Sequence, residues 1–348
     1  MAFTQWDPTE LPIRPGLYIN FKEAALMQIT GGARGTVAMP LKAYAGTATA
    51  KSFYTVENEA DAITLFGENN IQSIKFALQG GAKEVLVYTM PATPTAPDYV
   101  DMRDAFEARP FNVFVYDGEV SAAEQANTLT WLQTNRSEKK HFMFVTGGSA
   151  SDDQNPATGN TRSTTLADDA VVNLITGVTI GETSYPSGQY AAFIAGLIAG
   201  TPINRSITYS QVAVDDVTKR LRNSEIVMAL KAGSLVLVHD GEKVKVEQGV
   251  TTAKKKIRSI RARQAVATDI EKTARDNYIG KLDNNEAGRD TLFSAIKAYL
   301  ETLEDSNVLT DPVVGQDPLF KSEGDQVYVS VSYDEVDSME RIFLTINV

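Results

Sequence analysis

Hydrophobic residues between Ala33 and about Gly200 alternate between short apolar runs and longer segments with helical spacing. The short runs predict β-strands, because apolar runs bounded by turn residues are typical of strands buried on both faces. They cover residues 35–39, 84–90, 111–116, 141–146 and 177–180. The amphipathic segments predict helices over residues 58–66, 71–79 and 121–134. This alternation of strands and helices predicts an α/β domain.

Three further segments of this half have distinct characters. Residues 91–97 (PATPTAP) break the alternation, and the polar residues 147–163 predict a long exposed loop. Residues 190–200 (YAAFIAGLIAG) are the most apolar stretch of the chain. They are about half as long as a membrane span, so they predict a buried helix that packs closely through its small residues.

The second half of the chain predicts a different mixture of elements. An Asp240-Gly241 pair joins two β-prone runs, SLVLVH and KVKVEQ, and is a strong hairpin signal. The other predicted elements are a strand at 207–214, a helix near 224–232, helices at about 265–282 and 288–303, and alternating strands at 326–333 and 341–348.

Both ends of the chain predict extended arms. The first 22 residues are rich in proline and contain only one short strand-like run, and the last run alternates apolar and polar residues. Such segments become ordered by adding a strand to an open sheet edge, either of this subunit or of a neighbour. The strand residues of the arms are Leu17, Tyr18 and Ile19 at one end and Ile342, Leu344, Ile346 and Val348 at the other.

Composition narrows the class of protein. The 348 residues are 43% apolar and 22% charged, which is typical of a globular protein of one large or two smaller domains. The net charge of −11 argues against nucleic-acid binding through the overall field. The absence of cysteine fits a reducing compartment, and the first 15 residues lack the basic start and apolar run of a signal peptide. We therefore expect neither a membrane nor a nucleic acid as partner.

The search for catalytic or ligand-binding residues yields no assignment. The chain has no phosphate-loop motif and no GxGxxG spacing, and Gly147-Gly148-Ser149 does not match a nucleophile elbow. The isolated histidines, His141 and His239, are interpreted as residues at strand ends. The acidic pairs are interpreted as solvated charges and helix caps, and they are Asp152-Asp153, Asp168-Asp169 and Asp215-Asp216. We expect no catalytic residue, no cofactor and no metal site.

The clearest charge feature is the basic run at residues 254–263 (KKKIRSIRAR), which contains six basic residues and no acidic one. One interpretation is a docking surface for an anionic partner, which would be an acidic protein or, less well supported, a phosphate backbone. The other interpretation is an ordinary solvated helix face. No aromatic side chains interleave with the charges, which argues against stacking on nucleic-acid bases.

Several segments resemble the contractile tail sheath proteins of myovirus-type phages, defective prophages and tail-like bacteriocins. The resemblance is carried by residues 187–209 (SGQYAAFIAGLIAGTPINRSITY), by the block from Arg263 through DNYIGKLDNN to Leu309, and by residues 327–348 (VYVSVSYDEVDSMERIFLTINV). Looser matches lie at residues 52–67 and 79–90. Together these segments cover about two thirds of the chain.

The resemblance implies a fold and a division of the chain. It implies an α/β (α+β overall) protein whose outer α/β domain with a mixed sheet is inserted before a C-terminal α+β sheath domain. The implied parts are an N-terminal arm at 1–22, an outer domain at 23–205, an inner domain at 206–337 and a C-terminal strand arm at 338–348.

The resemblance also implies a function. It implies a non-enzymatic subunit that polymerises as a six-fold helical sheath around a tail tube and contracts to drive the tube through the bacterial envelope. Strand exchange by the arms would link neighbours, and the tube, baseplate and tail terminator proteins would be partners. The particle would be a virion tail or bacteriocin assembled in the host cytoplasm. The basic residues Lys254, Lys255, Lys256 and Arg258 would face the tube.

Two alternatives remain at this stage. The strand and helix alternation is also typical of a cytoplasmic α/β nucleotide-binding protein or enzyme. A non-contractile virion or adhesion protein would share the arms but would not convert between extended and contracted tubes.

Overall fold

The core of the protein is a seven-stranded, mostly parallel sheet in a computed structural model that describes residues 34–347. The strand order is β11-β6-β5-β4-β1-β3-β2, and the edge strand β2 alone runs antiparallel to its neighbour. The strands are β1 (Thr36–Leu41), β2 (Phe53–Val56), β3 (Glu84–Thr89), β4 (Val113–Val115), β5 (Met143–Thr146), β6 (Val171–Leu174) and β11 (Ser234–Leu235). The α/β fold class is thereby confirmed.

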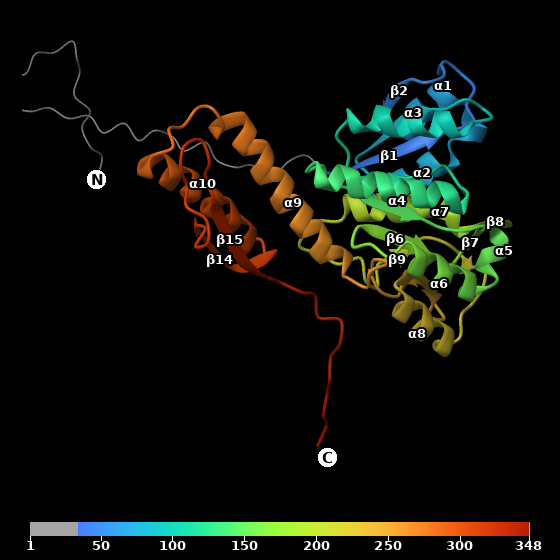
Figure 1. Ribbon diagram of the computed structural model, residues 1–348. Coiled ribbons are helices and arrows are strands. Elements are labelled where there is room, and N and C mark those ends of the chain that lie inside the picture. Colours follow the sequence, from blue (N-terminus) through green and yellow to red (C-terminus); the bar gives the residue numbers. More distant parts are fainter. Residues whose placement is uncertain (1–33, 348) are drawn as a thin grey trace, which may run out of the picture.

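Helices cover both faces of this sheet (Figure 1). Alternate residues of β1 point to opposite cores, with Val37 and Met39 in one and Ala38 in the other. The strands therefore read as continuous apolar runs. One core contains side chains of α1 (Glu59–Phe66), α2 (Gln72–Gly80) and α7 (Ser187–Gly200); the other contains α3 (Ala96–Glu107) and α4 (Ala122–Ser137). A 3₁₀ turn, η1 (Glu68–Asn70), separates α1 from α2.

The predicted buried helix at 190–200 is confirmed as α7. Its small residues allow backbone contact with α2, because a Cβ at Gly196 would lie 2.0 Å from the carbonyl oxygen of Ala77. A Cβ at Gly200 would lie equally close to the carbonyl oxygen of Gly81. No described helix combines the length and apolar character that crossing a membrane requires.

One sequence prediction in this half is wrong. Residues 147–163 are not a long exposed loop but contain two short helices, α5 (Ala150–Asp153) and α6 (Pro156–Thr165). The Ser149 side chain accepts a hydrogen bond from the Asp152 amide and caps α5. Pro156 occupies the first turn of α6, where its missing amide hydrogen is not needed. The polar residues that suggested a loop therefore act as helix starts.

Two small sheets and one helix complete the α/β body. The first sheet has the order β10-β7-β8, and the second has the order β12-β13-β9. The predicted hairpin at Asp240-Gly241 is confirmed, since it joins antiparallel β12 and β13. The bounds are β7 (Val178–Ile180), β8 (Thr183–Tyr185), β9 (Gln211–Val212), β10 (Asp216–Val217), β12 (Leu237–His239), β13 (Val244–Val246) and α8 (Asn223–Ala232).

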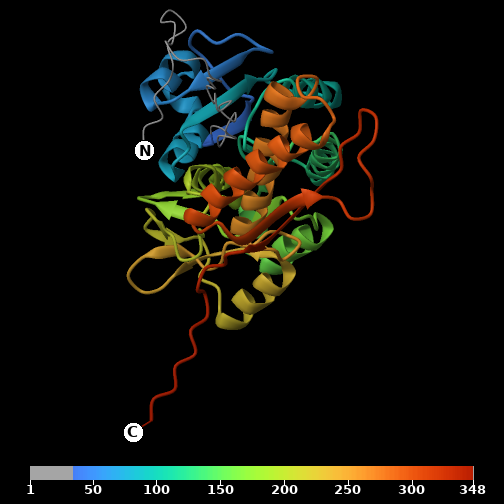
Figure 2. The same cartoon turned by 90° about the vertical axis from the view of Figure 1, so that its left-hand side faces the viewer.

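A smaller C-terminal unit projects from this body (Figures 1 and 2). It consists of α9 (Ile257–Thr273), a π-helical turn η2 (Ala274–Tyr278), α10 (Glu286–Asp305) and the antiparallel hairpin of β14 (Leu309–Gln316) and β15 (Val329–Glu335). The start of α9 packs in the core of the body through Ile257 and Ile260. Further along, Ala262 and Val266 pack in a separate core with α10 and the hairpin. The long helix α9 thus joins the two units.

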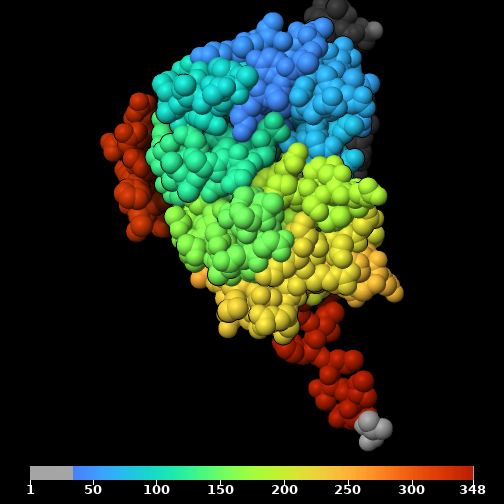
Figure 3. Space-filling view, turned by 90° about the vertical axis from the view of Figure 1, so that its right-hand side faces the viewer, coloured from blue at the N-terminus to red at the C-terminus, as the bar shows by residue number. Residues whose placement is uncertain are grey.

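The change of core does not coincide with residue 206. Strand β11, which lies at 234–235, pairs with β6 in the main sheet. The packing of the body therefore continues to the start of α9. Figure 3 shows the face of the body that lies away from the C-terminal unit. Side chains of the body's own helices and strands cover this face.

Candidate interaction surfaces

The C-terminal arm, defined here as residues 341–347, extends away from both units (Figure 1). Its apolar side chains are almost fully in solvent: Ile342 is 81% exposed, Leu344 79% and Ile346 74%. In the described part of the chain the arm has no strand partner, although residues 341–348 alternate as a strand does. Exposed apolar residues of this kind mark a site of protein association. Val348 lies outside the described residues, as do Leu17, Tyr18 and Ile19 of the N-terminal arm.

The β14–β15 hairpin offers open backbone edges. Within residues 34–347 it is a sheet of two strands, so no further strand pairs with the outer edge of either one. One face packs on α9 and α10 through residues such as Val331 and Tyr333. The hairpin can therefore accept additional strands without losing its own core.

The segment before the arm is held tightly. We call residues 335–340 the arm root. The Glu340 side chain is only 7% exposed and accepts hydrogen bonds from Thr208 Oγ1 at 2.8 Å and Gln248 Nε2 at 2.9 Å. Lys256 Nζ lies 3.2 Å from the same carboxylate and 2.6 Å from that of Asp337. Burial alone would raise the pKa of Glu340, but these three partners outweigh it and lower the pKa.

The predicted tube-facing basic residues do not form one exposed patch. Lys254 and Lys255 are exposed, whereas Lys256 binds the arm root and Arg258 is buried. Arg258 donates from Nη1 to Ser338 Oγ at 2.9 Å and from Nη2 to the Asn307 carbonyl at 2.8 Å. Burial lowers the pKa of this guanidinium, and Asp337 opposes the shift. Half of the predicted patch is thus used within the subunit.

Two other arginines of the basic run also have intramolecular partners. Arg263 Nε lies 2.5 Å from a carboxylate oxygen of Glu335 in the arm root. Arg261 donates to the carbonyl of Thr201 at the C-terminus of α7, where a cation is favoured by the helix dipole. Burial lowers the pKa of Arg261 to about 10. Sequence reasoning missed the arm root as a partner, although its acids follow the basic run in the same half of the chain.

The position where an α/β enzyme would bind a ligand is closed by the chain itself. Ligands of such folds bind at the carboxyl ends of the strands, next to the point where the strand order reverses, which here lies between β1 and β4. The N-terminus of α7 packs there against the ends of β4 and β5. Gly188 N donates to the Gly148 carbonyl at 2.8 Å, and Gly148 N donates to Ser187 Oγ at 2.8 Å. A Cβ at Gly147 would lie 2.4 Å from the Ser187 carbonyl.

The other candidate polar residues have structural partners. Asp153 is buried and accepts hydrogen bonds from the amide and hydroxyl of Ser187. Asp152 pairs with Arg162, Asp168 with Arg136, and Asp216 with Arg220. His239 accepts a hydrogen bond from the Gly241 amide, and burial lowers the pKa of His141. Within residues 34–347 no group of three or more potential ligands could hold a metal ion.

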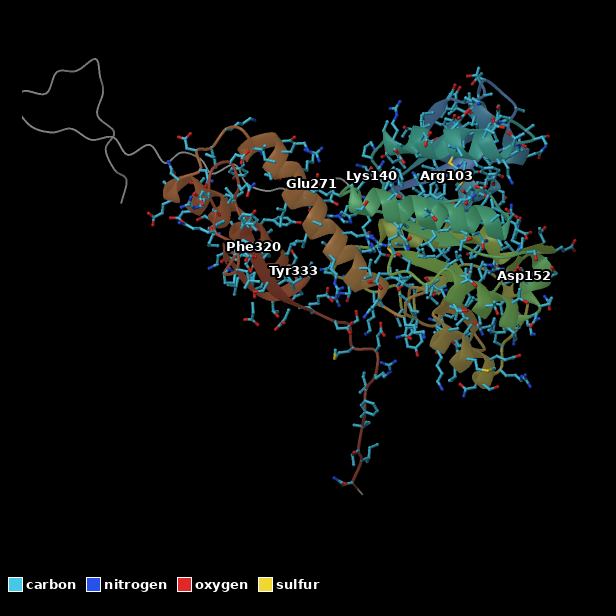
Figure 4. The ribbon with its side chains drawn as sticks, viewed as in Figure 1. Arg103, Lys140, Asp152, Glu271, Phe320 and Tyr333 are labelled. Atoms are coloured by element: carbon cyan, nitrogen blue, oxygen red, sulfur yellow. The ribbon has the colours of Figure 1, made fainter. Side chains whose placement is uncertain are left out.

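A groove of about 860 Å³ separates the body from α9 at the opposite, amino-terminal edge of the main sheet. Thr36, Glu84 and Asn112 line it on the body side, and Asp269 and Glu271 line it on α9. Figure 4 shows Glu271 on α9 and Lys140 at the facing end of the body. Lys140 Nζ donates three hydrogen bonds of 2.8 Å to carbonyls at the C-terminal end of α3, those of Phe106, Glu107 and Arg109, so this amine has a structural role.

The described residues thus combine a filled ligand crevice, an exposed apolar arm and a hairpin of two strands. Comparison with known proteins gives the family. The phage tail sheath protein central domain matches residues 92–252, and the phage tail sheath C-terminal domain matches residues 250–348. The chain belongs to the phage tail sheath family. It is a structural protein of a phage or prophage tail sheath and hence a component of a multi-subunit tail particle.

Individual relatives agree with this assignment. A tail sheath protein of Clostridium phage phiCD119 is 22% identical over 303 residues, which cover 82% of this chain and 79% of the relative. A sheath tail protein from Desulfitobacterium hafniense has the same fold, with a TM-score of 0.77 and 20% identity over 96% of this chain and all of that one. The helical sheath of the anti-feeding prophage in its contracted state has a TM-score of 0.75 and 15% identity, covering 97% and 99% of the two chains.

Proposed function

We propose that this protein is the subunit of a contractile sheath that polymerises as a six-fold helical tube around a tail tube. Contraction of the sheath would drive the enclosed tail tube through a bacterial envelope. The observation that carries the proposal is the exposed apolar arm beside a hairpin with two open edges. A second support is the similar fold of the anti-feeding prophage helical sheath, whose structure is of the contracted state.

Strand exchange follows from an accounting of edges and arms. Within residues 34–347 the hairpin has two open edges, those of β14 and β15. The sequence predicts two arms, residues 1–22 and 338–348. If each edge accepts one arm of a neighbour, every subunit gives and receives two strands. Contacts of this heterologous kind do not close between two subunits and generate rings or filaments. The strand residues are those predicted from the sequence: Leu17, Tyr18, Ile19, Ile342, Leu344, Ile346 and Val348.

The layers of the sheath follow the two units. We assign the α/β body to the outer layer and the C-terminal unit to the inner layer, with the boundary at the start of α9 instead of residue 206. Lys254 and Lys255 lie at this boundary and remain exposed, so we retain them as the cations that meet an acidic tail tube. Baseplate and tail terminator proteins would bind the two ends of the sheath, and assembly would take place in the host cytoplasm.

The proposal is tested by electron microscopy of purified protein at high concentration. We expect tubes for the full chain and none for a chain lacking residues 341–348. The deletion begins at 341 because residues 338 and 340 bind the body. A melting temperature equal to that of the full chain will establish that the shortened monomer is folded. Tubes formed by the shortened chain would contradict strand exchange by this arm.

Two alternatives give different outcomes. A nucleotide-binding enzyme would retain a nucleotide on purification, but the packing of α7 against the ends of β4 and β5 argues against that site. A non-contractile virion or adhesion protein would form tubes of one length and width only. Conversion of extended tubes into shorter and wider ones would distinguish the contractile sheath from it.

A further inference from the structure

The basic run and the arm root form one intramolecular seat. Three cations spaced along the start of α9 each bind the root: Lys256 binds Asp337 and Glu340, Arg258 binds Ser338, and Arg263 binds Glu335. Opposite charges on two segments about 80 residues apart are thereby matched. The seat is distinct from the arm and from the hairpin edges, which the proposed function uses.

Glu340 differs from the other residues of the root in what it binds. Among residues 34–347, the partners of Asp337 and Ser338 outside the root lie at the start of α9, whereas Glu340 also reaches Thr208 and Gln248. Both of these residues lie in the α/β body: Thr208 precedes β9 in the chain, and Gln248 follows β13. Its carboxylate has therefore exchanged water for donors from three separate segments. Removing one partner of such a buried, hydrogen-bonded charge is costly.

The chain changes from held to free at this residue. Met339 is 91% exposed and Ile342 is 81% exposed, while the Glu340 side chain between them is 7% exposed. The last backbone hydrogen bond from the root to the rest of the unit runs from Val336 N to the Val308 carbonyl at 3.3 Å. Among the described residues, the segment beyond 336 is held through side chains, and Glu340 is the last residue with such contacts.

We propose that Glu340 is the fixed joint of the C-terminal arm and delivers a pull on the arm to the α/β body. The proposal rests on the proposed function, in which a neighbour binds the arm. A pull at Ile342 then reaches the body through Glu340, Thr208 and Gln248, as well as the C-terminal unit through β15. Without Glu340 the free segment begins after Ser338, which Arg258 still holds, and so lengthens by residues 339 and 340, about 7 Å of extended chain. Such slack would loosen the spacing between linked subunits.

A spin-label experiment on the monomer tests the joint directly. The chain contains no cysteine, so Met339→Cys and Leu344→Cys each give a single labelling position on an exposed side chain. We expect restricted label motion at 339 and free motion at 344. Glu340→Ala should raise the mobility of the label at 339 toward that at 344, although the bond from Arg258 to the adjacent Ser338 remains. Gln248→Met, which removes one donor on the body side, should have the same effect to a smaller extent.

The matched control is Glu335→Ala. It removes a carboxylate from the same root, but residue 335 is also held by the pairing of β15, so the label at 339 should remain restricted. A single cooperative melting transition will verify that each variant is folded. Equal mobility at 339 and 344 in the otherwise unchanged chain, or no effect of Glu340→Ala, would overturn the joint.

A second experiment addresses the transmitted pull. Tubes of Glu340→Ala should form, because the arm and the hairpin edges are intact, but they should dissociate at lower denaturant concentration than tubes of Glu335→Ala. Equal resistance would overturn the mechanical role. If the unchanged chain forms no tubes, the proposed function fails instead, and the label result on the monomer still decides whether the joint exists.

Discussion

Arg34 and Asp269 are 235 positions apart in the chain, yet Arg34 Nη2 lies 2.5 Å from Asp269 Oδ2. The Asp269 carboxylate also accepts a hydrogen bond from Tyr299 Oη at 2.5 Å and is 3% exposed. Burial and this carboxylate raise the pKa of Tyr299, so the phenol keeps its proton and donates at neutral pH. One carboxylate thus joins the first described residue before β1 to α9 and α10.

This relationship predicts that the two units depend on Asp269 for their mutual docking. Asp269→Ala should lower the free energy of unfolding by about 3 kcal/mol, because it leaves a guanidinium and a phenol without their shared acceptor. Tyr299→Phe should cost about 1 kcal/mol. Glu301→Ala is the control, since its pair with Lys297 is half exposed and its loss should cost under about 0.5 kcal/mol. Chemical denaturation measures all three; equal losses for Asp269→Ala and Glu301→Ala would contradict the prediction.

The contact between α2 and α7 predicts a strong effect of one methyl group. Gly196→Ala should lower the free energy of unfolding by about 3 kcal/mol, because the added carbon would displace the Ala77 backbone. Gly315→Ala in β14 is the matched control, as its added carbon would meet no atom within 4 Å. Its melting temperature should remain close to that of the unchanged protein. A tolerated Gly196→Ala would mean that the two helices can separate.

The buried Asp153 predicts a pH dependence of stability. Burial raises the pKa of its carboxyl to about 6 from the ordinary 3.8, although hydrogen bonds from Ser187 oppose the shift. Between about pH 4 and pH 6 the folded protein therefore holds a proton that the unfolded chain has released. The contribution of Asp153 to the free energy of unfolding is therefore greatest below pH 4. It falls by about 3 kcal/mol as the pH rises from about 4 to 6.

The test of this effect is the difference between the protein and Asp153→Asn. The variant should lack this part of the slope and should melt at a higher temperature at pH 7. Asp152→Asn is the control, because Asp152 is more exposed and pairs with Arg162. Parallel curves of melting temperature against pH for the protein and Asp153→Asn would disprove the assignment.

The two exposed lysines, Lys254 and Lys255, predict an effect on binding to the tail tube and none on sheath-only tubes. Reversing Lys254 and Lys255 to glutamate should leave the melting temperature and sheath-only tubes unchanged but weaken co-assembly with the tail tube. Lys297→Glu, an exposed lysine of α10, should affect neither property. Cosedimentation with purified tail tubes at several salt concentrations measures the effect. Unchanged co-assembly of the double variant would remove these lysines from the tube contact.

Much of the main sheet was predictable from the sequence because its strands are buried on both faces. Four of its strands, β1, β3, β4 and β5, coincide with predicted apolar runs. The predicted helices at 58–66 and 121–134 coincide with α1 and α4, which Asn58 and Ser121 cap in the structure. The short strands β2 and β6 escaped prediction because neither stands out from its surroundings by pattern or length. Residues 147–163 misled because the same polar residues cap helices and populate loops.

The exposed arm followed from alternation, which needs only local information. The use of the basic run did not. A run of positive charge attracts any acidic segment that the fold brings near, and its sequence is the same whether that segment belongs to a partner or to the same chain. After β15 the chain passes the start of α9. There Lys256, Arg258 and Arg263 bind the arm root, whereas Lys254 and Lys255 remain exposed.

The sequence by itself therefore determined the α/β class, the close-packed glycine helix and the apolar arm, because each depends on periodicity along the chain. Tertiary structure alone decided that the ligand crevice is filled by α7, that Asp269 joins the two units and that Glu340 holds the arm root. These features depend on contacts between residues whose separation in the chain is between 34 and 235 positions. Local patterns carry no information about such contacts.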